Sequence, residues 1–167
     1  KSLFIPRQRL ALLTLAKLIN QSSASMPVTR LLSLCLNKVA MQCNAHCRWK
    51  ASGDSLVDMF GRHAISMVWD FAESNPLSMS TGGWAPAVNG IAAVIRRLSW
   101  SKALIGQVSC SDACRLPLPD EAVDIWFTDP PYYDNIPYSD LSDFFYVWMK
   151  RSLSRELSYF DTELTPK

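Results

Sequence analysis

The sequence predicts an α/β protein, with a mainly helical region in residues 1–100 followed by part of an open parallel sheet in residues 101–167. Two observations lead to this prediction. Apolar residues recur at helical spacing through much of the first hundred residues, whereas residues 123–128 form a short apolar run rich in β-branched and aromatic side chains. Such a run is typical of a strand buried in a parallel sheet. At 167 residues the chain has the size of one domain and can bury a core.

Four segments have the apolar spacing of amphipathic helices. The first runs from Pro6 to about residue 20, and the second starts after Ser25 and continues toward Cys47. Proline suits the first turn of both. A third helix is expected over residues 85–98, and a fourth over about 140–153, with Ser139 or Asp140 as its cap. The fourth helix is expected to pack on the sheet through Leu141, Phe144, Phe145 and Trp148.

Two strands are expected, at residues 107–110 and 123–128. The second stops at Asp129, because the two prolines that follow lack a backbone N–H and have a restricted φ. Ligands of open α/β sheets bind at the carboxyl ends of the strands. An acid, a rigid turn and an aromatic ring at that edge therefore indicate a site.

The tetrad Asp129-Pro130-Pro131-Tyr132 suits chemistry on a nucleobase amine. An exocyclic amine is a poor nucleophile, because its lone pair is delocalised into the ring. A carboxylate and a carbonyl that accept its two N–H groups favour the pyramidal nitrogen of the transition state. Asp129 and the Pro130 carbonyl are the candidate acceptors. Pro131 would hold that carbonyl in place, and an extruded base could stack on Tyr132.

This tetrad resembles the catalytic motif of S-adenosylmethionine-dependent amino DNA methyltransferases, chiefly those that modify adenine N6. The longer run DPPYYDNIPYSDLSDFFYVW, with GRHAISMVWDFAESNP upstream and TELTPK at the end, resembles the large adenine-specific DNA methylases more narrowly. The resemblance implies a Rossmann-like methyltransferase sheet, of which residues 101–167 would be the catalytic half. It also implies DNA as the partner and S-adenosylmethionine as the cofactor.

The resemblance implies further site residues. Asp112 and Ala113 match an acid and a small residue that contact the cofactor adenine in such families. Tyr133, Asn135 and Tyr138 could line the base pocket, mainly because of their position. The glycine-rich cofactor loop of these enzymes is absent from this sequence, so we expect an internal fragment of a longer enzyme that binds the cofactor weakly.

Charge is unevenly distributed along the chain. Residues 1–100 hold 11 Lys/Arg and 4 Asp/Glu, a net charge of +7, whereas residues 101–167 hold 6 and 11, a net charge of −5. The basic part could face a DNA backbone, or the imbalance could be an ordinary solvated surface. Interleaved basic and aromatic residues between 48 and 80 could likewise form a nucleic-acid surface, or the aromatic residues could belong to the core with the charges on its rim. His63 is a poor candidate for a general base, because this reaction needs no strong base.

Five cysteines without an export signal suggest reduced thiols in the cytoplasm. Cys35, Cys43, His46 and Cys47 allow a zinc interpretation, but the cysteine spacing also suits one buried helical face, and no metal site is expected. No apolar run approaches the roughly 20 residues that span a bilayer. Two other functions stay open. One is methylation of base amines in RNA, and the other is a non-catalytic DNA-binding module of a modification or defence system.

Overall fold

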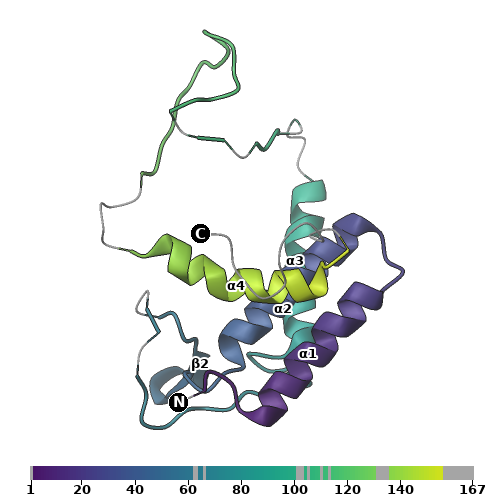
Figure 1. Ribbon diagram of the computed structural model, residues 1–167, viewed down its shortest axis with the longest axis vertical. Helices are drawn as coiled ribbons and strands as arrows, with labels where there is room; N and C mark the ends of the chain where they lie inside the picture. Colours follow the sequence, from purple (N-terminus) through teal and green to yellow (C-terminus); the bar gives the residue numbers. More distant parts are fainter. Residues whose placement is uncertain are drawn as a thin grey trace.

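Four α-helices make up most of the structure, a computed structural model that describes residues 2–61, 64–65, 67–100, 104, 106–109, 111–112, 114–130 and 136–155 (Figure 1). The helices are α1 (Pro6–Gln21), α2 (Met26–Gln42), α3 (Trp84–Ser99) and α4 (Tyr138–Ser152). Between α2 and α3 lie β1 (Arg48–Lys50), a 3₁₀ turn (Ala51–Gly53) and β2 (Ser55–Val57). The two strands pair antiparallel, with Trp49 opposite Leu56.

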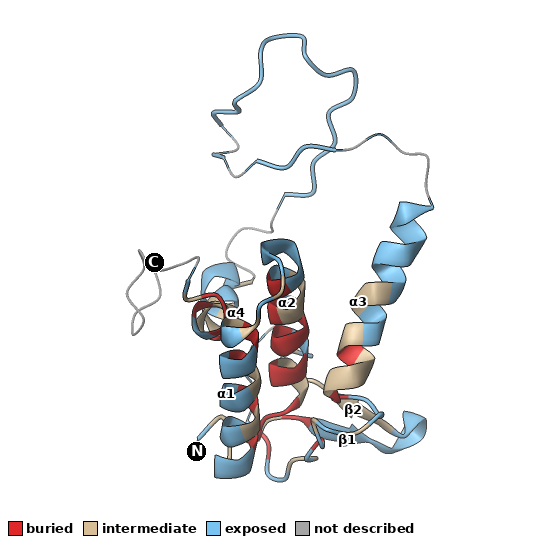
Figure 2. Ribbon diagram, turned by 90° about the vertical axis from the view of Figure 1, so that its right-hand side faces the viewer, coloured by how far each residue is buried: buried red, intermediate tan, exposed pale blue. Residues whose placement is uncertain are grey.

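The core forms around α2, which packs against all three other helices. Leu36, Val39 and Ala40 of α2 are fully buried, and Leu12 of α1 is fully buried against them. The buried surface of α2 is continuous along its length, whereas most of α3 and the outer side of α1 are exposed (Figure 2). The four sequence-predicted helices are therefore confirmed, and they supply most of the core that they share.

Helix α4 joins the core through aromatic side chains. Trp148 is buried and meets Phe4 edge to face, with ring centroids 5.3 Å apart. Phe144 also stacks on Phe4, with ring centroids 6.1 Å apart, and it contacts Phe60 at 5.2 Å. Such ring pairs stabilise the fold by roughly 0.5–1.5 kcal/mol beyond the area that they bury. The apolar face of α4 was predicted correctly, but it packs on helices and not on a sheet.

The predicted Rossmann-like sheet is wrong, because β1 and β2 are the only strands of the described residues and they form a two-stranded antiparallel sheet. Residues 107–109 and 123–128 are not strands, and every described residue from 104 to 130 is exposed. This segment extends away from the helices in both views (Figures 1 and 2). An apolar run becomes a strand only where neighbouring strands satisfy its backbone and bury its side chains. Among the described residues, no neighbouring strand pairs with residues 123–128 and no surface buries their side chains.

The glycine pair before α3 serves a tight turn. Gly82 has φ = +88°, and a Cβ there would lie 2.7 Å from Ser74 Cβ. A Cβ on Gly83 would lie 2.0 Å from the Ser78 carbonyl oxygen. The glycine pair therefore allows the chain to approach its own backbone and side chains closely, at Ser78 and Ser74.

Truncation of a buried leucine tests whether α2 is the centre of the core. We expect Leu36→Ala, at a fully buried position, to lower the free energy of unfolding by about 2–5 kcal/mol. Leu34→Ala, on the same helix but 47% exposed, should change it by less than about 0.5 kcal/mol. Urea denaturation followed by circular dichroism measures both. Equal losses in the two variants would show that this face of α2 is not the core.

Candidate functional site

Asp129 and Pro130 are the two tetrad residues that the structure describes, and both are exposed. No hydrogen bond or ion pair connects the Asp129 carboxylate to any described residue, so both of its oxygens can accept bonds from a ligand. No backbone hydrogen bond holds residues 123–128 to another described segment. The acceptors are thus accessible, but the structure does not hold them rigidly.

Several predicted site residues lie outside the described part of the chain. They are Pro131, Tyr132, Tyr133, Asn135 and the cofactor candidate Ala113. His63 lies outside it as well. The pairing of Asp129 with an aromatic platform therefore stays a prediction.

Asp112 is exposed and stabilises a turn. Its Oδ1 accepts a hydrogen bond from the Cys114 backbone N–H at 2.9 Å, and its carbonyl accepts one from Arg115 N–H at 3.0 Å. Since a carboxylate has further lone pairs, this turn leaves acceptor capacity for a ligand. No hydrogen bond or ion pair joins Asp112 to Asp129, both of which are described. The contact predicted between Asp112 and the cofactor adenine therefore stays a prediction, with which this turn is compatible.

Tyr138 is the first residue of α4 and is 53% exposed. Its backbone N–H donates to the Ile136 carbonyl at 2.9 Å, so the chain turns just before the helix. The helix begins at Tyr138, with Pro137 in the cap position predicted for Ser139 or Asp140. Tyr138 thus stands where the exposed segment returns to the core, and its ring is accessible to a ligand.

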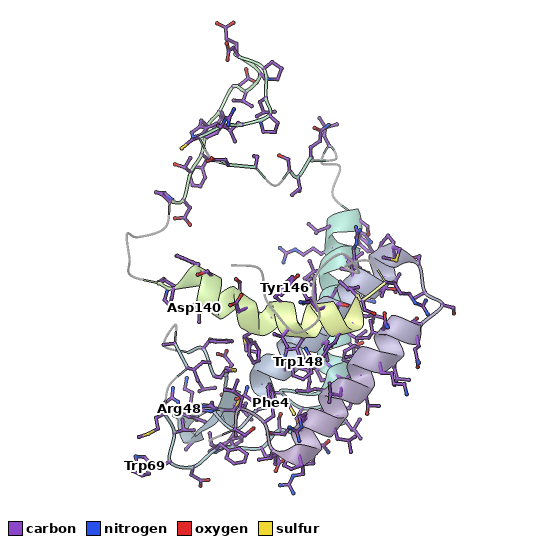
Figure 3. The ribbon with its side chains drawn as sticks, viewed as in Figure 1. Phe4, Arg48, Trp69, Asp140, Tyr146 and Trp148 are labelled. Carbon is purple, nitrogen blue, oxygen red and sulfur yellow. The ribbon has the colours of Figure 1, made fainter. Side chains whose placement is uncertain are left out.

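The basic and aromatic residues between 48 and 80 divide into two groups. Phe60 packs against Phe144 and Phe145 and belongs to the interior. Trp49 and Trp69 are 57% and 91% exposed, and Arg48 and Lys50 are exposed on β1. Arg48 and Trp69 lie at the same end of the molecule (Figure 3). This end therefore combines exposed rings and cations, as a nucleic-acid surface does.

The cysteines around the end of α2 are buried thiols. Cys35, Cys43 and Cys47 are free and buried, and Cys47 Sγ lies 3.2 Å from the Gln42 carbonyl oxygen. Burial raises the pKa of the Cys35 and Cys43 thiols and raises that of Cys47 to about 11. Metal ligation requires thiolates, which this environment disfavours. No group of three metal-binding side chains occurs among the described residues.

A cavity that the sequence interpretation missed lies in another part of the molecule. It has a volume of about 640 Å³ and lies between α1 and residues 73–77. Neither it nor the other two described cavities is lined by a residue of 101–138. The described residues of 104–130 are all exposed, so they enclose no buried site for a cofactor around Asp112 and Asp129.

No family model matches the chain, and no curated protein or solved structure matches it either. The methyltransferase resemblance therefore rests on the residues of this sequence alone. None of the described helices has the length and apolar character that crossing a membrane requires.

The raised pKa of Cys47 predicts a dependence of stability on alkaline pH. The unfolded thiol ionises near pH 9 and the folded one near 11. The stability that the buried neutral thiol contributes is therefore complete below pH 9 and is lost as the pH rises toward 11. We expect the free energy of unfolding of Cys47→Ala to fall less steeply over this range than that of the unchanged chain.

Cys114→Ala is the matched control, because Cys114 is free and exposed. Its slope between pH 9 and 11 should equal that of the unchanged chain. Urea titrations at several pH values give both slopes. Identical slopes for all three proteins would show that Cys47 ionises as easily in the folded as in the unfolded chain.

Proposed function

We propose that this chain carries the catalytic segment of an S-adenosylmethionine-dependent DNA methyltransferase that modifies adenine N6. The observation that supports the proposal is the Asp129-Pro130-Pro131-Tyr132 tetrad, together with the flanking residues that resemble the large adenine-specific DNA methylases. The exposed Asp129 carboxylate is compatible with it. An ion pair buried in the core would have argued against it.

In this proposal the chain's own groups prepare the amine. The Asp129 carboxylate and the Pro130 carbonyl accept the two hydrogens of the extruded adenine amine, which concentrates the nitrogen lone pair away from the ring. Tyr132 supplies a stacking face for the base. Positioning and polarisation account for the rate enhancement, and no covalent enzyme intermediate is needed. The cofactor would supply the methyl group.

The cofactor-binding surface has to come from polypeptide outside these residues. The glycine-rich loop of the resembling enzymes is absent from the sequence, and the described residues around Asp112 are all exposed. We therefore place the chain within a larger cytoplasmic enzyme, in keeping with its free thiols. In that assembly the exposed segment 104–130 would gain the neighbours that it lacks here.

DNA would approach the end of the molecule that carries Arg48, Lys50, Trp49 and Trp69. These residues are exposed, and they belong to the part of the chain that carries a net charge of +7. Cations there would neutralise phosphates, and the rings could stack on unpaired bases. Binding should therefore weaken as salt is raised.

Substitution of Asp129 tests the catalytic assignment. In the polypeptide encoded by the full open reading frame, Asp129→Ala should lower methyl transfer to DNA by about a hundredfold or more, as the loss of a transition-state hydrogen bond does. Binding of S-adenosylmethionine should be unchanged. Transfer of a tritiated methyl group to duplex DNA and calorimetry measure the two quantities.

Asp124→Ala is the matched control, an exposed acid in the same segment, and it should keep full activity. Undiminished transfer by Asp129→Ala would reject the assignment. Transfer to RNA but not to DNA would favour the RNA base-amine alternative. Salt-sensitive DNA binding with no transfer to either would favour the non-catalytic module.

A separate prediction concerns the isolated 167-residue chain. Because the glycine-rich loop is absent from the sequence and the described residues of 104–130 are all exposed, we expect it to bind S-adenosylmethionine more weakly than the full open reading frame product, with no saturation at micromolar concentrations. Isothermal titration calorimetry measures this directly. Micromolar affinity in the isolated chain would contradict the prediction and show that a cofactor site exists within these residues.

A further inference from the structure

Helix α3 continues its apolar face beyond the part that packs on the core. Val88 and Ile91 are partly buried against the core residues. Further along the helix, Val94, Ile95 and Leu98 are 57%, 44% and 64% exposed. They follow Ile91 by three, four and seven residues, so they lie on the same side of the helix. The C-terminal half of α3 therefore presents an apolar face that is largely uncovered (Figure 2).

This face is flanked by cations. Arg96 and Arg97 lie in the last turn of α3, which contains no acidic residue. Both are exposed, and neither guanidinium has an ion-pair partner in the part of the chain that the structure describes. Arg97 follows Val94 by three residues and is therefore its neighbour on the helix surface. An occupant that complements this face needs apolar side chains next to acidic ones.

Residues 120–127 of the same chain have this composition, and we call them the acidic arm. They read DEAVDIWF, with three acids and no basic residue. Ile125, Trp126 and Phe127 are 83%, 59% and 90% exposed. None of the three carboxylates forms an ion pair with a described residue. The arm therefore offers apolar and acidic groups that are both available for a contact.

The arm does not contact α3 of its own chain through polar groups. No hydrogen bond or ion pair joins the described residues 114–130 to α3. In both views these residues extend beyond the exposed end of α3, at the same end of the molecule (Figures 1 and 2). Two copies that meet at this end around a twofold axis would bring each arm to the α3 of the other copy. Such a contact forms twice in one dimer.

We propose that the C-terminal half of α3 binds the acidic arm of a second copy of this chain, so that the two copies exchange arms. This arrangement pairs opposite charges. Contact between two α3 faces would bring Arg96 and Arg97 of both copies together, and contact between two arms would bring their carboxylates together. The proposal does not depend on the methyltransferase assignment, and the second copy would be one of the neighbours that residues 104–130 lack in the single chain.

The available area suffices for a dimer of modest affinity. An aromatic side chain buries about 150–250 Å², so the exposed parts of Trp126 and Phe127 in one arm amount to about 300 Å². Two arms, each covered by an equal area of the facing helix, give about 1,200 Å² in total, the lower end of stable interfaces. Ile125 adds to this area, because it is 83% exposed.

Other occupants complement the face less well. Duplex DNA could pair its phosphates with Arg96 and Arg97, but it gains nothing from Ile95 and Leu98 beside them. An anionic membrane surface would match the cations and the apolar face of a helix. It would also repel the arm that follows α3, since the arm carries three acids and no basic residue.

Sedimentation equilibrium of the 167-residue chain tests the proposal. The measurement covers about 1–100 μM, because interfaces of limited area have dissociation constants in the micromolar range. The average mass should rise with concentration from the 18.8 kDa of one chain toward twice that value. Docking of the arm on its own α3 would instead leave the mass at that of one chain throughout.

Substitutions on the two sides of the contact identify the surfaces. Leu98→Glu places a carboxylate on the face that meets the acidic arm, and Phe127→Glu removes an aromatic ring from the arm. Each should raise the dissociation constant of the dimer by about tenfold or more, the effect of losing a central contact. Leu10→Glu is the matched control, because Leu10 is 68% exposed on α1, close to the 64% of Leu98. It should dimerise like the unchanged chain.

All three substitutions lie at exposed positions, so circular dichroism should show the same helix content in each. A mass of one chain at every concentration would overturn the proposal. So would undiminished dimerisation of Phe127→Glu, which would show that the α3 faces pair with each other, or of Leu98→Glu, which would show that the arms do. An equal loss in Leu10→Glu would place the interface on α1.

A final measurement covers the membrane alternative. If the chain stays monomeric and binds phosphatidylglycerol vesicles, and Leu98→Glu abolishes this binding, the face belongs to a lipid surface and the dimer is rejected. The proposal expects the chain to dimerise and to leave such vesicles unbound. None of these measurements involves methyl transfer, so their failure and that of the Asp129 assignment are distinguishable.

Discussion

The fold depends on the burial of α2 between three other helices. Leu36 and Val39 are fully buried there, and Leu12 closes the core from α1. Helix α4 is distant in sequence, but Trp148 and Phe144 bring it onto this core through Phe4. These aromatic contacts join the two ends of the described chain. The described residues between α3 and α4 are thereby anchored at both ends, although none of them is buried.

Because α3 and α4 are packed on either side, the fold does not require the apolar segment 104–130 to join the core. Ile125 and Phe127 are 83% and 90% exposed, whereas the helices on either side are packed. Segments with few buried contacts and no backbone ladder belong to the least stable part of a protein. In the proposed enzyme the acceptors of Asp129 and Pro130 would gain their rigidity from surrounding polypeptide. The cavity between α1 and residues 73–77 differs from this exposed segment, because hydrogen bonds within the chain already hold its second wall in place.

The helices could be predicted from the sequence, and the sheet could not. Helical spacing and prolines near the first turns located α1 and α2 to within a few residues at most ends. The run at residues 123–128 has strand propensity, but propensity becomes a strand only with partners. In the candidate site, the structure shows that Asp129 and Pro130 are exposed and that Asp112 stabilises a turn. The exposure could not be deduced from the motif, because it depends on what packs around the segment. The cavity between α1 and residues 73–77 could not be predicted, because Leu15 and Leu18 match the pattern of an ordinary amphipathic helix.

By itself the sequence determined where the four helices form, because spacing, proline placement and the apolar content of each segment are local properties. It also contains the tetrad, and the chemistry proposed for it rests on residue types and order alone. Only the tertiary structure decided which side of α1 faces the core, that α4 packs on helices, and that residues 104–130 stay exposed. These outcomes depend on contacts between residues far apart in the chain, which no local pattern encodes.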